Sequence, residues 1–194
     1  MKRAPRADAQ RNRDRLLTEA RVAFLANGTD ASLEDIAARA GVGVGTLYRH
    51  FPSRETLLEA LLRERFDALT ERARELADRP APREALVTWT LAFIETTTVY
   101  RGLTAAMTAT LRDETSALHA SCAAMRDAGT TLLARAQSAG EVRADITPVE
   151  FLTLVAGVSW ACEQTSGGES AGERLLPLLF EGLERRRGNA RSPE

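Results

Sequence analysis

Aromatic residues and cysteines are scarce in this sequence of 194 residues. Phe, Trp and Tyr make up 5% of it, and no segment alternates Val, Ile, Thr and Tyr as a half-buried strand would. The two cysteines, Cys122 and Cys162, lie far apart without CxxC spacing, which argues against a disulfide framework or a zinc site and suits a reducing compartment. Because Ala, Leu, Arg and Glu are abundant instead, the composition favours helices.

Long hydrophobic runs are also missing. The longest nearly apolar run, residues 151–162, is too short to cross a bilayer. Residues 1–6 are basic but lead into no apolar stretch, so they do not form a secretory signal. We therefore expect a soluble, cytoplasmic protein with no membrane partner.

Enzyme motifs are absent as well. No HExxH or GxSxG motif occurs, and the two histidines are His50 and His119. The glycines of residues 41–45 would need a further glycine at Thr46 and a preceding strand to bind a dinucleotide. We therefore expect no catalytic residue, metal or cofactor. His119 and Cys122 lie three residues apart on a predicted helix, and metal binding or oxidant sensing is the alternative for this pair.

Charge is distributed unevenly along the chain. Residues 1–54 carry ten cationic and six acidic side chains, a net charge of +4, whereas residues 55–194 carry sixteen and twenty-one, a net charge of −5. A basic N-terminal part suits phosphate binding, although an imbalance of this size also arises by chance.

The first thirty residues predict a basic arm followed by a helix. We expect residues 1–10 to be disordered, with arginines that either reach a minor groove or stay solvated. An apolar stripe then predicts a helix that ends near Gly28. The arm arginines are Arg3, Arg6, Arg11 and Arg13, and the stripe is Leu16, Leu17, Ala20 and Phe24.

Two short helices follow. Ser32 and Asp35 have the spacing of a capping box, which opens a helix over residues 33–40. Gly41 can end that helix with a positive φ, and a second helix covers about 44–50. Two short helices around a glycine turn, packed on the preceding helix, predict a helix-turn-helix.

Three stretches in this region resemble the signature of TetR-type repressors: residues 32–37, 40–51 and 53–58. The resemblance covers residues 10–62 without gaps. It implies an all-α fold with an N-terminal three-helix helix-turn-helix domain, residues 1–54, and a larger C-terminal helical ligand-binding and dimerisation domain, residues 55–194.

The resemblance also implies a set of DNA contacts. It assigns Tyr48, His50 and Arg54 to phosphates, whereas Glu34 stands where some relatives place a base-reading arginine. Each residue alone has a simpler interpretation, such as a half-buried aromatic, a helix cap or a solvated cation. The full set expected to contact DNA is Ser32, Val44, Gly45, Thr46, Tyr48, Arg49, His50 and Arg54.

The rest of the chain predicts further helices. One long helix, residues 54–78, would link the two domains, and breaks at Pro80, Gly102, Gly140 and Gly168 separate the others. They are expected over about residues 83–100, 103–112, 115–139, 149–165 and 171–187.

In the family, the last two long helices form a four-helix bundle across a two-fold axis, which implies a homodimer that reads two half-sites of operator DNA. A core role is the alternative for each interface candidate. The candidates are Leu152, Val155, Leu175, Leu179 and Leu183.

A small-molecule effector is the second implied partner. Aromatic and polarizable residues with few polar neighbours would suit an apolar or aromatic molecule, although a core role is simpler for each. The candidates are Trp89, Phe93, Met107, His119, Cys122, Met125 and Trp160.

Together these expectations describe a dimeric repressor that leaves a palindromic operator when an effector tilts the helix over residues 54–78. An activator would use the same parts. The alternative from a different class is a helical protein-interaction module whose helix-turn-helix no longer binds DNA.

Overall fold

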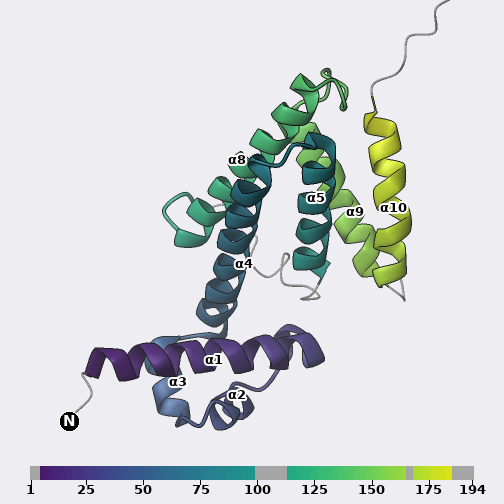
Figure 1. Ribbon diagram of the computed structural model, residues 1–194. Coiled ribbons are helices and arrows are strands. Elements are labelled where there is room, and N and C mark those ends of the chain that lie inside the picture. Colours follow the sequence, from purple (N-terminus) through teal and green to yellow (C-terminus); the bar gives the residue numbers. More distant parts are fainter. Residues whose placement is uncertain (1–4, 99–112, 165–167, 185–194) are drawn as a thin grey trace, which may run out of the picture. The chain divides into compact units, whose positions relative to one another are not determined.

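The computed structural model describes residues 5–98, 113–164 and 168–184, and all regular structure in these ranges is helical (Figure 1). The predicted all-α fold is confirmed. No helix among the described residues is long and apolar enough to span a membrane. The described chain divides into two compact units, the first with residues 5–65 and 113–122, the second with residues 66–98, 123–164 and 168–184.

The first unit begins with α1, Pro5–Asn27, so the expectation of a disordered arm is wrong for residues 5–10. Proline is favoured in the first turn of a helix, and Asp8 lies in that turn, where a carboxylate interacts well with the helix dipole. The 3₁₀ turn η1, Gly28–Asp30, ends α1 at the predicted glycine, whose φ is 70°.

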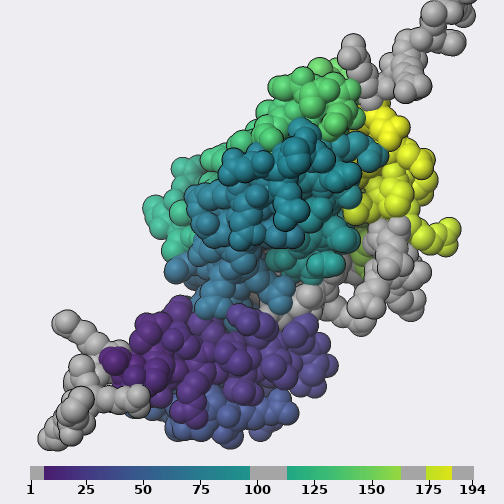
Figure 2. Space-filling view, viewed as in Figure 1, coloured from purple at the N-terminus to yellow at the C-terminus, as the bar shows by residue number. Residues whose placement is uncertain are grey.

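The helix-turn-helix consists of α2, Leu33–Arg39, and α3, Val44–His50. Both pack on α1, and in Figure 2 the side chains of α1 and of the α2–α3 segment form one continuous surface. The residues buried between these helices are Leu16, Leu17, Ala20, Phe24, Leu33, Ile36, Ala37, Ala40 and Leu47.

The turn between α2 and α3 has a fixed geometry. Gly41 has a φ of 64°, and its N–H donates to the carbonyl of Ala38 at 3.0 Å. The N–H of Val42 donates to the carbonyl of Ala37, also at 3.0 Å. This pair of hydrogen bonds is the Schellman motif, which satisfies the last carbonyls of α2 and sets the direction in which α3 leaves.

Helix α4, Arg54–Ala77, starts with a reciprocal cap. The N–H of Ser53 donates to Oγ1 of Thr56 at 3.1 Å, and the N–H of Thr56 donates to Oγ of Ser53 at 3.3 Å. Phe51 is buried and extended before Pro52, which restricts the residue preceding it to such a backbone. The predicted start of this helix at residue 54 is confirmed.

The second unit contains three complete helices: α5 (Pro82–Thr98), α9 (Pro148–Gln164) and α10 (Gly168–Leu183). It also contains α4 from residue 66 on and α8 (Ala117–Ser138) from residue 123 on. Helix α9 packs on α5 and on α10. The predicted helices are confirmed with end points shifted by a few residues. The helix expected over residues 103–112 lies outside the described residues.

A buried tryptophan joins three helices of the second unit. Trp89 on α5 is fully buried, and its indole Nε1–H donates to the carbonyl of Leu69 on α4 at 3.0 Å. On α8, a Cβ added at Gly129 would lie 2.4 Å from the ring, so only glycine lets this helix approach so closely. Helices α4, α5 and α8 therefore meet at Trp89.

The connection from α8 to α9 is held to the end of α10. Gly140 has a φ of 72° and ends α8, and the N–H of Arg143 donates to the carbonyl of Leu183 at 2.9 Å. Thr147 and Glu150 then cap α9: the N–H of Thr147 donates to Oε2 of Glu150 at 2.8 Å, and the N–H of Glu150 donates to Oγ1 of Thr147 at 3.2 Å.

Candidate nucleic-acid interface

Helix α3 turns one face to the core of the first unit and the other to solvent. Leu47 is fully buried, whereas Val44 and Tyr48 are 42% and 44% exposed. Gly45 and Arg49 are exposed beside them. Since residues four apart lie on one side of a helix, Val44 and Tyr48 form one exposed row and Gly45 and Arg49 the next.

The chemistry of this face suits a DNA groove. The guanidinium of Arg49 donates from Nη2 to Oγ1 of Thr46 at 2.8 Å, which holds it along α3. A Cβ at Gly45 would meet no atom within 4 Å, so the backbone there is open to a close neighbour. Arginine and tyrosine donate hydrogen bonds to base edges and phosphate oxygens. The structure therefore brings Val44, Gly45, Thr46, Tyr48 and Arg49 together on α3.

Ser32 and His50 occupy the two ends of the helix-turn-helix. The Ser32 hydroxyl accepts the N–H of Asp35 at 3.1 Å and donates to Oε2 of Glu34 at 3.2 Å, so it caps α2 as expected. The ring of His50 is half-buried, with its centroid 6.4 Å from that of Phe51.

Arg54 lies at the first position of α4 and has partners within the protein. Its Nη1 donates to the carbonyls of Thr29 and Ala31 at 2.8 and 2.5 Å. No sequence pattern indicates these contacts, because the two carbonyls lie more than twenty residues earlier in the chain.

Arg13, which the sequence analysis assigned to the basic arm, and Arg15, which it did not assign, lie next to this region. The end of the Arg15 side chain lies over Gly41, where an added Cβ would come within 2.4 Å of Nη2. The guanidinium of Arg13 stacks 5.5 Å from the ring centroid of Phe51. Periodicity alone places both on α1 but does not reveal which turn of the chain faces them.

The effector candidates divide into three groups. Trp89, Phe93 and Met125 are buried in the second unit, and the first two rings lie 5.7 Å apart. His119 and Cys122 are half-buried near the start of α8. In contrast, Trp160 on α9 is 65% exposed. Met107 lies outside the described residues.

The dimer candidates also differ in exposure. Val155 and Leu183 are buried within the second unit, and Leu152, Leu175 and Leu179 are half-buried. The large apolar residues that α9 and α10 expose most are different ones, and sequence periodicity did not single them out. They are Val149, Leu154, Trp160 and Leu178.

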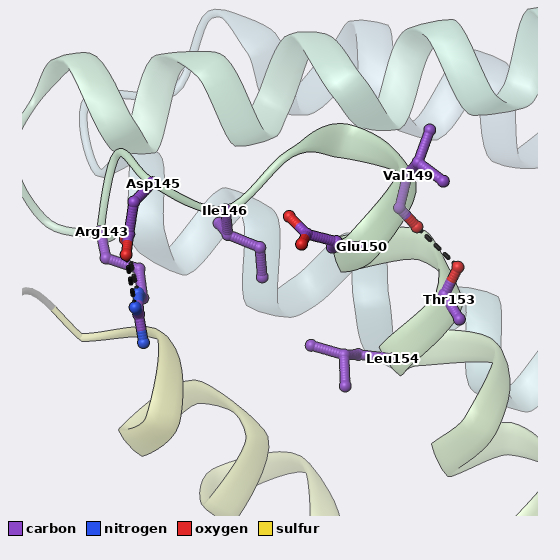
Figure 3. A pocket seen from close by; sticks show the side chains of 7 residues that line it. All are labelled: Arg143, Asp145, Ile146, Val149, Glu150, Thr153 and Leu154. Atoms are coloured by element: carbon purple, nitrogen blue, oxygen red, sulfur yellow. Dashed lines mark hydrogen bonds and ion pairs between the residues drawn. The ribbon is translucent and has the colours of Figure 1, made fainter.

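A cavity of about 530 Å³ opens at the start of α9, away from the effector candidates. In Figure 3 the paired side chains of Arg143 and Asp145 lie at one end, and Ile146 and Leu154 lie between them and Thr153. The two charged groups approach to 2.6 Å between Nε and Oδ1. The cavity is therefore mixed in character, with an ion pair beside apolar side chains.

Glu150 also lines this cavity, and its charge is stabilised by the α9 cap. The backbone N–H of Thr147 and then its hydroxyl donate to the carboxylate, which holds the pKa of Glu150 below its ordinary value. The carboxylate is committed to the helix cap, so it is a poor candidate for ligand binding.

An N-terminal helix-turn-helix with an exposed polar recognition face, joined to a larger helical unit, defines a DNA-binding transcriptional regulator. Residues 16–61 match the bacterial regulatory proteins of the tetR family, and residues 81–185 match the family described as transcriptional regulator SbtR-like, C-terminal domain. The chain belongs to the TetR family, which confirms the expectation of a regulator rather than an enzyme.

Solved structures extend this similarity over most of the chain. A TetR transcriptional regulator from Streptomyces coelicolor is 36% identical with a TM-score of 0.71, covering 90% of this chain and 99% of that one. A TetR regulatory protein from Mycobacterium vanbaalenii is 32% identical with a TM-score of 0.66, covering 94% and 100%.

Similarity to curated regulators is confined to a shorter region. The transcriptional repressor KstR of Mycolicibacterium smegmatis is 42% identical over 72 residues, which cover 34% of this chain and 35% of KstR. The chain thus matches about a third of the length of this relative.

Proposed function

We propose that this protein is a dimeric repressor that binds palindromic operator DNA and leaves it when a small apolar or aromatic molecule binds. The observation that carries the proposal is the exposed face of α3, where Tyr48, Arg49 and Gly45 lie clear of the protein core. The DNA-binding domain comprises residues 1–54 and the effector-binding and dimerisation domain residues 55–194. We place the protein in the cytoplasm, where its DNA target lies.

DNA contacts follow from the chemistry of each side chain. Tyr48 and His50 donate to phosphate oxygens and fix the register of the protein on the duplex. Arg49 and Thr46 face the major groove, and Gly45 lets the backbone approach it closely. Because phosphate contacts release counterions, binding weakens as salt rises.

Dimerisation involves the outer faces of α9 and α10. Val149, Trp160 and Leu178 are 75%, 65% and 61% exposed, and Leu154 is 45% exposed. Large apolar side chains that are exposed on a subunit are typical of a protein interface, and tryptophan is a frequent anchor in one. We keep the half-buried Leu152, Leu175 and Leu179 at the edge of this face and assign Val155 and Leu183 to the core beneath it.

The effector enters the second unit beside Trp89, Phe93 and Met125. This choice is supported by the hydrogen bond from Trp89 to the carbonyl of Leu69, because displacement of the indole acts directly on α4. A ligand that binds more tightly to the state with α4 displaced shifts the protein toward that state and so lowers its affinity for DNA. For typical coupling free energies, DNA affinity falls by about 5–150-fold.

The proposal is tested by selecting duplexes from a random-sequence pool with the wild-type protein. Fluorescence anisotropy then compares the selected duplex with a scrambled one at several salt concentrations, for wild type, Tyr48→Ala and Val22→Ala. Val22 is an exposed apolar residue on α1 and serves as the matched control. We expect binding that prefers the selected duplex and weakens with salt. Tyr48→Ala should weaken it at least tenfold, on the order of 1.4 kcal/mol, and Val22→Ala should leave it unchanged. Absence of any binding at low salt would favour a protein-interaction module instead.

A further inference from the structure

Arg54 donates to two backbone carbonyls that lie at the same place in the fold. Its Nη1 is 2.8 Å from the carbonyl oxygen of Thr29 and 2.5 Å from that of Ala31. The residue is half-buried, and Ala31 is buried. A guanidinium Nη carries two hydrogens, so both hydrogens of Nη1 have an acceptor within the protein.

The two carbonyls belong to the segment that enters α2. Ser32, the cap of α2, follows Ala31 directly, and the backbone hydrogen bonds of α2 begin with Ile36 N–H donating to the carbonyl of Ser32 at 3.2 Å. The carbonyls of Thr29 and Ala31 therefore lie outside that ladder and are available to Arg54. The contact joins the first residue of α4 to Ala31, directly before the α2 cap, and to Thr29, three residues before it.

This connection differs from another polar link between the early helices and α4. Arg21 and Glu64 form an ion pair at 3.0 Å between two exposed side chains, which salt screens and which contributes little. The Arg54 contact is half-buried and uses neutral backbone acceptors. It is therefore the more rigid of the two links and the less sensitive to salt.

We propose that Arg54 is a positioning residue, which couples the first turn of α4 to the placement of α2 and α3, instead of a phosphate ligand. Its effect reaches α3 because Ile36 and Ala37 of α2 and Leu47 of α3 are buried together in the same unit. A displacement of α4 at Arg54 pulls on the entry to α2 and so moves the recognition face. The inference rests on the proposed DNA-binding function and departs from the phosphate role that the family resemblance implies for this position.

The salt dependence of DNA binding separates the two roles. Each phosphate contact contributes about 0.9 to the slope of log K against log salt, whereas a positioning residue alters affinity without altering that slope. The experiment compares wild type, Arg54→Gln and Arg49→Gln on a duplex selected from a random pool by the wild type. All are measured at a temperature where circular dichroism shows each variant folded.

For Arg54→Gln we expect affinity to fall by about tenfold, an unchanged salt slope and an unfolding temperature lower by about 5 °C, since two hydrogen bonds to a charged group are lost. Arg49 is an exposed cation on α3, and within the groove its charge also displaces counterions from nearby phosphates. For Arg49→Gln we therefore expect a shallower slope and an unchanged unfolding temperature. Arg54→Met, which keeps the aliphatic stem, gives the same comparison if the glutamine variant does not fold.

Two results would overturn the proposal. A slope shallower by about 0.9 in Arg54→Gln would make Arg54 a phosphate ligand. If Arg54→Gln is folded but less stable and still binds DNA with the affinity and salt slope of the wild type, Arg54 contributes to stability alone. Binding by the wild type itself tests the proposed function separately, because it does not depend on either variant.

Discussion

The recognition segment around α3 and the outer face of α9 and α10 both expose side chains, but their sequences encode that exposure differently. Around α3, a serine cap, a glycine with positive φ and a proline fix the ends of each short helix, so the solvent-facing side follows from a few residues. In α9, apolar residues occupy every side, and Val155 is buried while Leu154 next to it is exposed. Caps and turn residues therefore predict the exposed side of a helix when the residues that cover its other side are near in sequence. They do not predict it when burial depends on helices that are distant in sequence.

The two tryptophans sharpen this comparison most. Trp89→Ala removes a fully buried ring that joins α4, α5 and α8, and we expect it to lower the free energy of unfolding by about 3–5 kcal/mol. Trp160→Ala removes a ring that is 65% exposed, so the subunit should keep its fold while the dimer dissociation constant rises about thirtyfold. Chemical denaturation and analytical ultracentrifugation measure the two effects. A dimer unaffected by Trp160→Ala would remove this residue from the interface.

Two glycines of the second unit give the next largest contrast. A Cβ at Gly129 would lie 2.4–2.9 Å from three atoms of the Trp89 ring, which its own hydrogen bond holds in place, so Gly129→Ala should cost about 1–3 kcal/mol. At Gly157 in α9 an added Cβ meets nothing within 4 Å, and Gly157→Ala should stabilise the subunit by up to about 1 kcal/mol. Equal unfolding midpoints in urea for the two variants would show that α8 does not pack on Trp89 so closely.

The same contrast exists within the helix-turn-helix. Gly41→Ala forces a side chain into a φ of 64° and should cost about 1–2 kcal/mol, since the end of the Arg15 side chain can move aside but the backbone cannot. Gly45→Ala has open space on α3 and should raise the unfolding temperature while weakening DNA binding. Thermal unfolding and anisotropy on one selected duplex measure both quantities. Stronger DNA binding by Gly45→Ala would show that the backbone of α3 does not approach the groove closely.

The smallest expected effect concerns the α9 cap. The pKa of Glu150 is lowered in the folded protein, so its contribution to stability is present above the ordinary value of 4.5 and is lost as pH falls through the folded pKa. Glu150→Gln should therefore lower the unfolding temperature near neutral pH, and the difference from wild type should vanish in acid. Glu114→Gln, at an exposed carboxylate before α8, is the control, and a difference that persists at low pH would assign the effect to packing instead of charge.

The sequence predicted the fold better than the arrangement of side chains. Helix starts at Ser32, Ser53 and Thr147 and helix ends at Gly28, Gly41 and Gly140 depend on hydrogen bonds within a few residues, and the structure has each of them. Residues 5–10 were the exception, because the arginines of the N-terminal arm suggested disorder although this segment has a proline and an acidic residue suited to a first helical turn.

The candidate sites could be predicted only in part. The exposed side of α3 followed from its short amphipathic pattern, with Leu47 inward and Tyr48 outward. In contrast, the partners of Arg54 are backbone carbonyls, which carry no sequence signal at all. The exposure of Trp160 depends on how α9 packs against α5 and α10, and one chain's periodicity does not determine which apolar side faces those helices.

The most direct test of the central claim is the binding of the wild-type protein and Tyr48→Ala to a selected duplex across a range of salt concentrations. The account predicts specific binding that weakens steeply with salt and at least about tenfold with the substitution, while the circular dichroism spectrum stays the same, because Tyr48 is exposed and contributes little to the core. Equal binding of selected and scrambled duplexes by both proteins, or no binding at low salt, would contradict it.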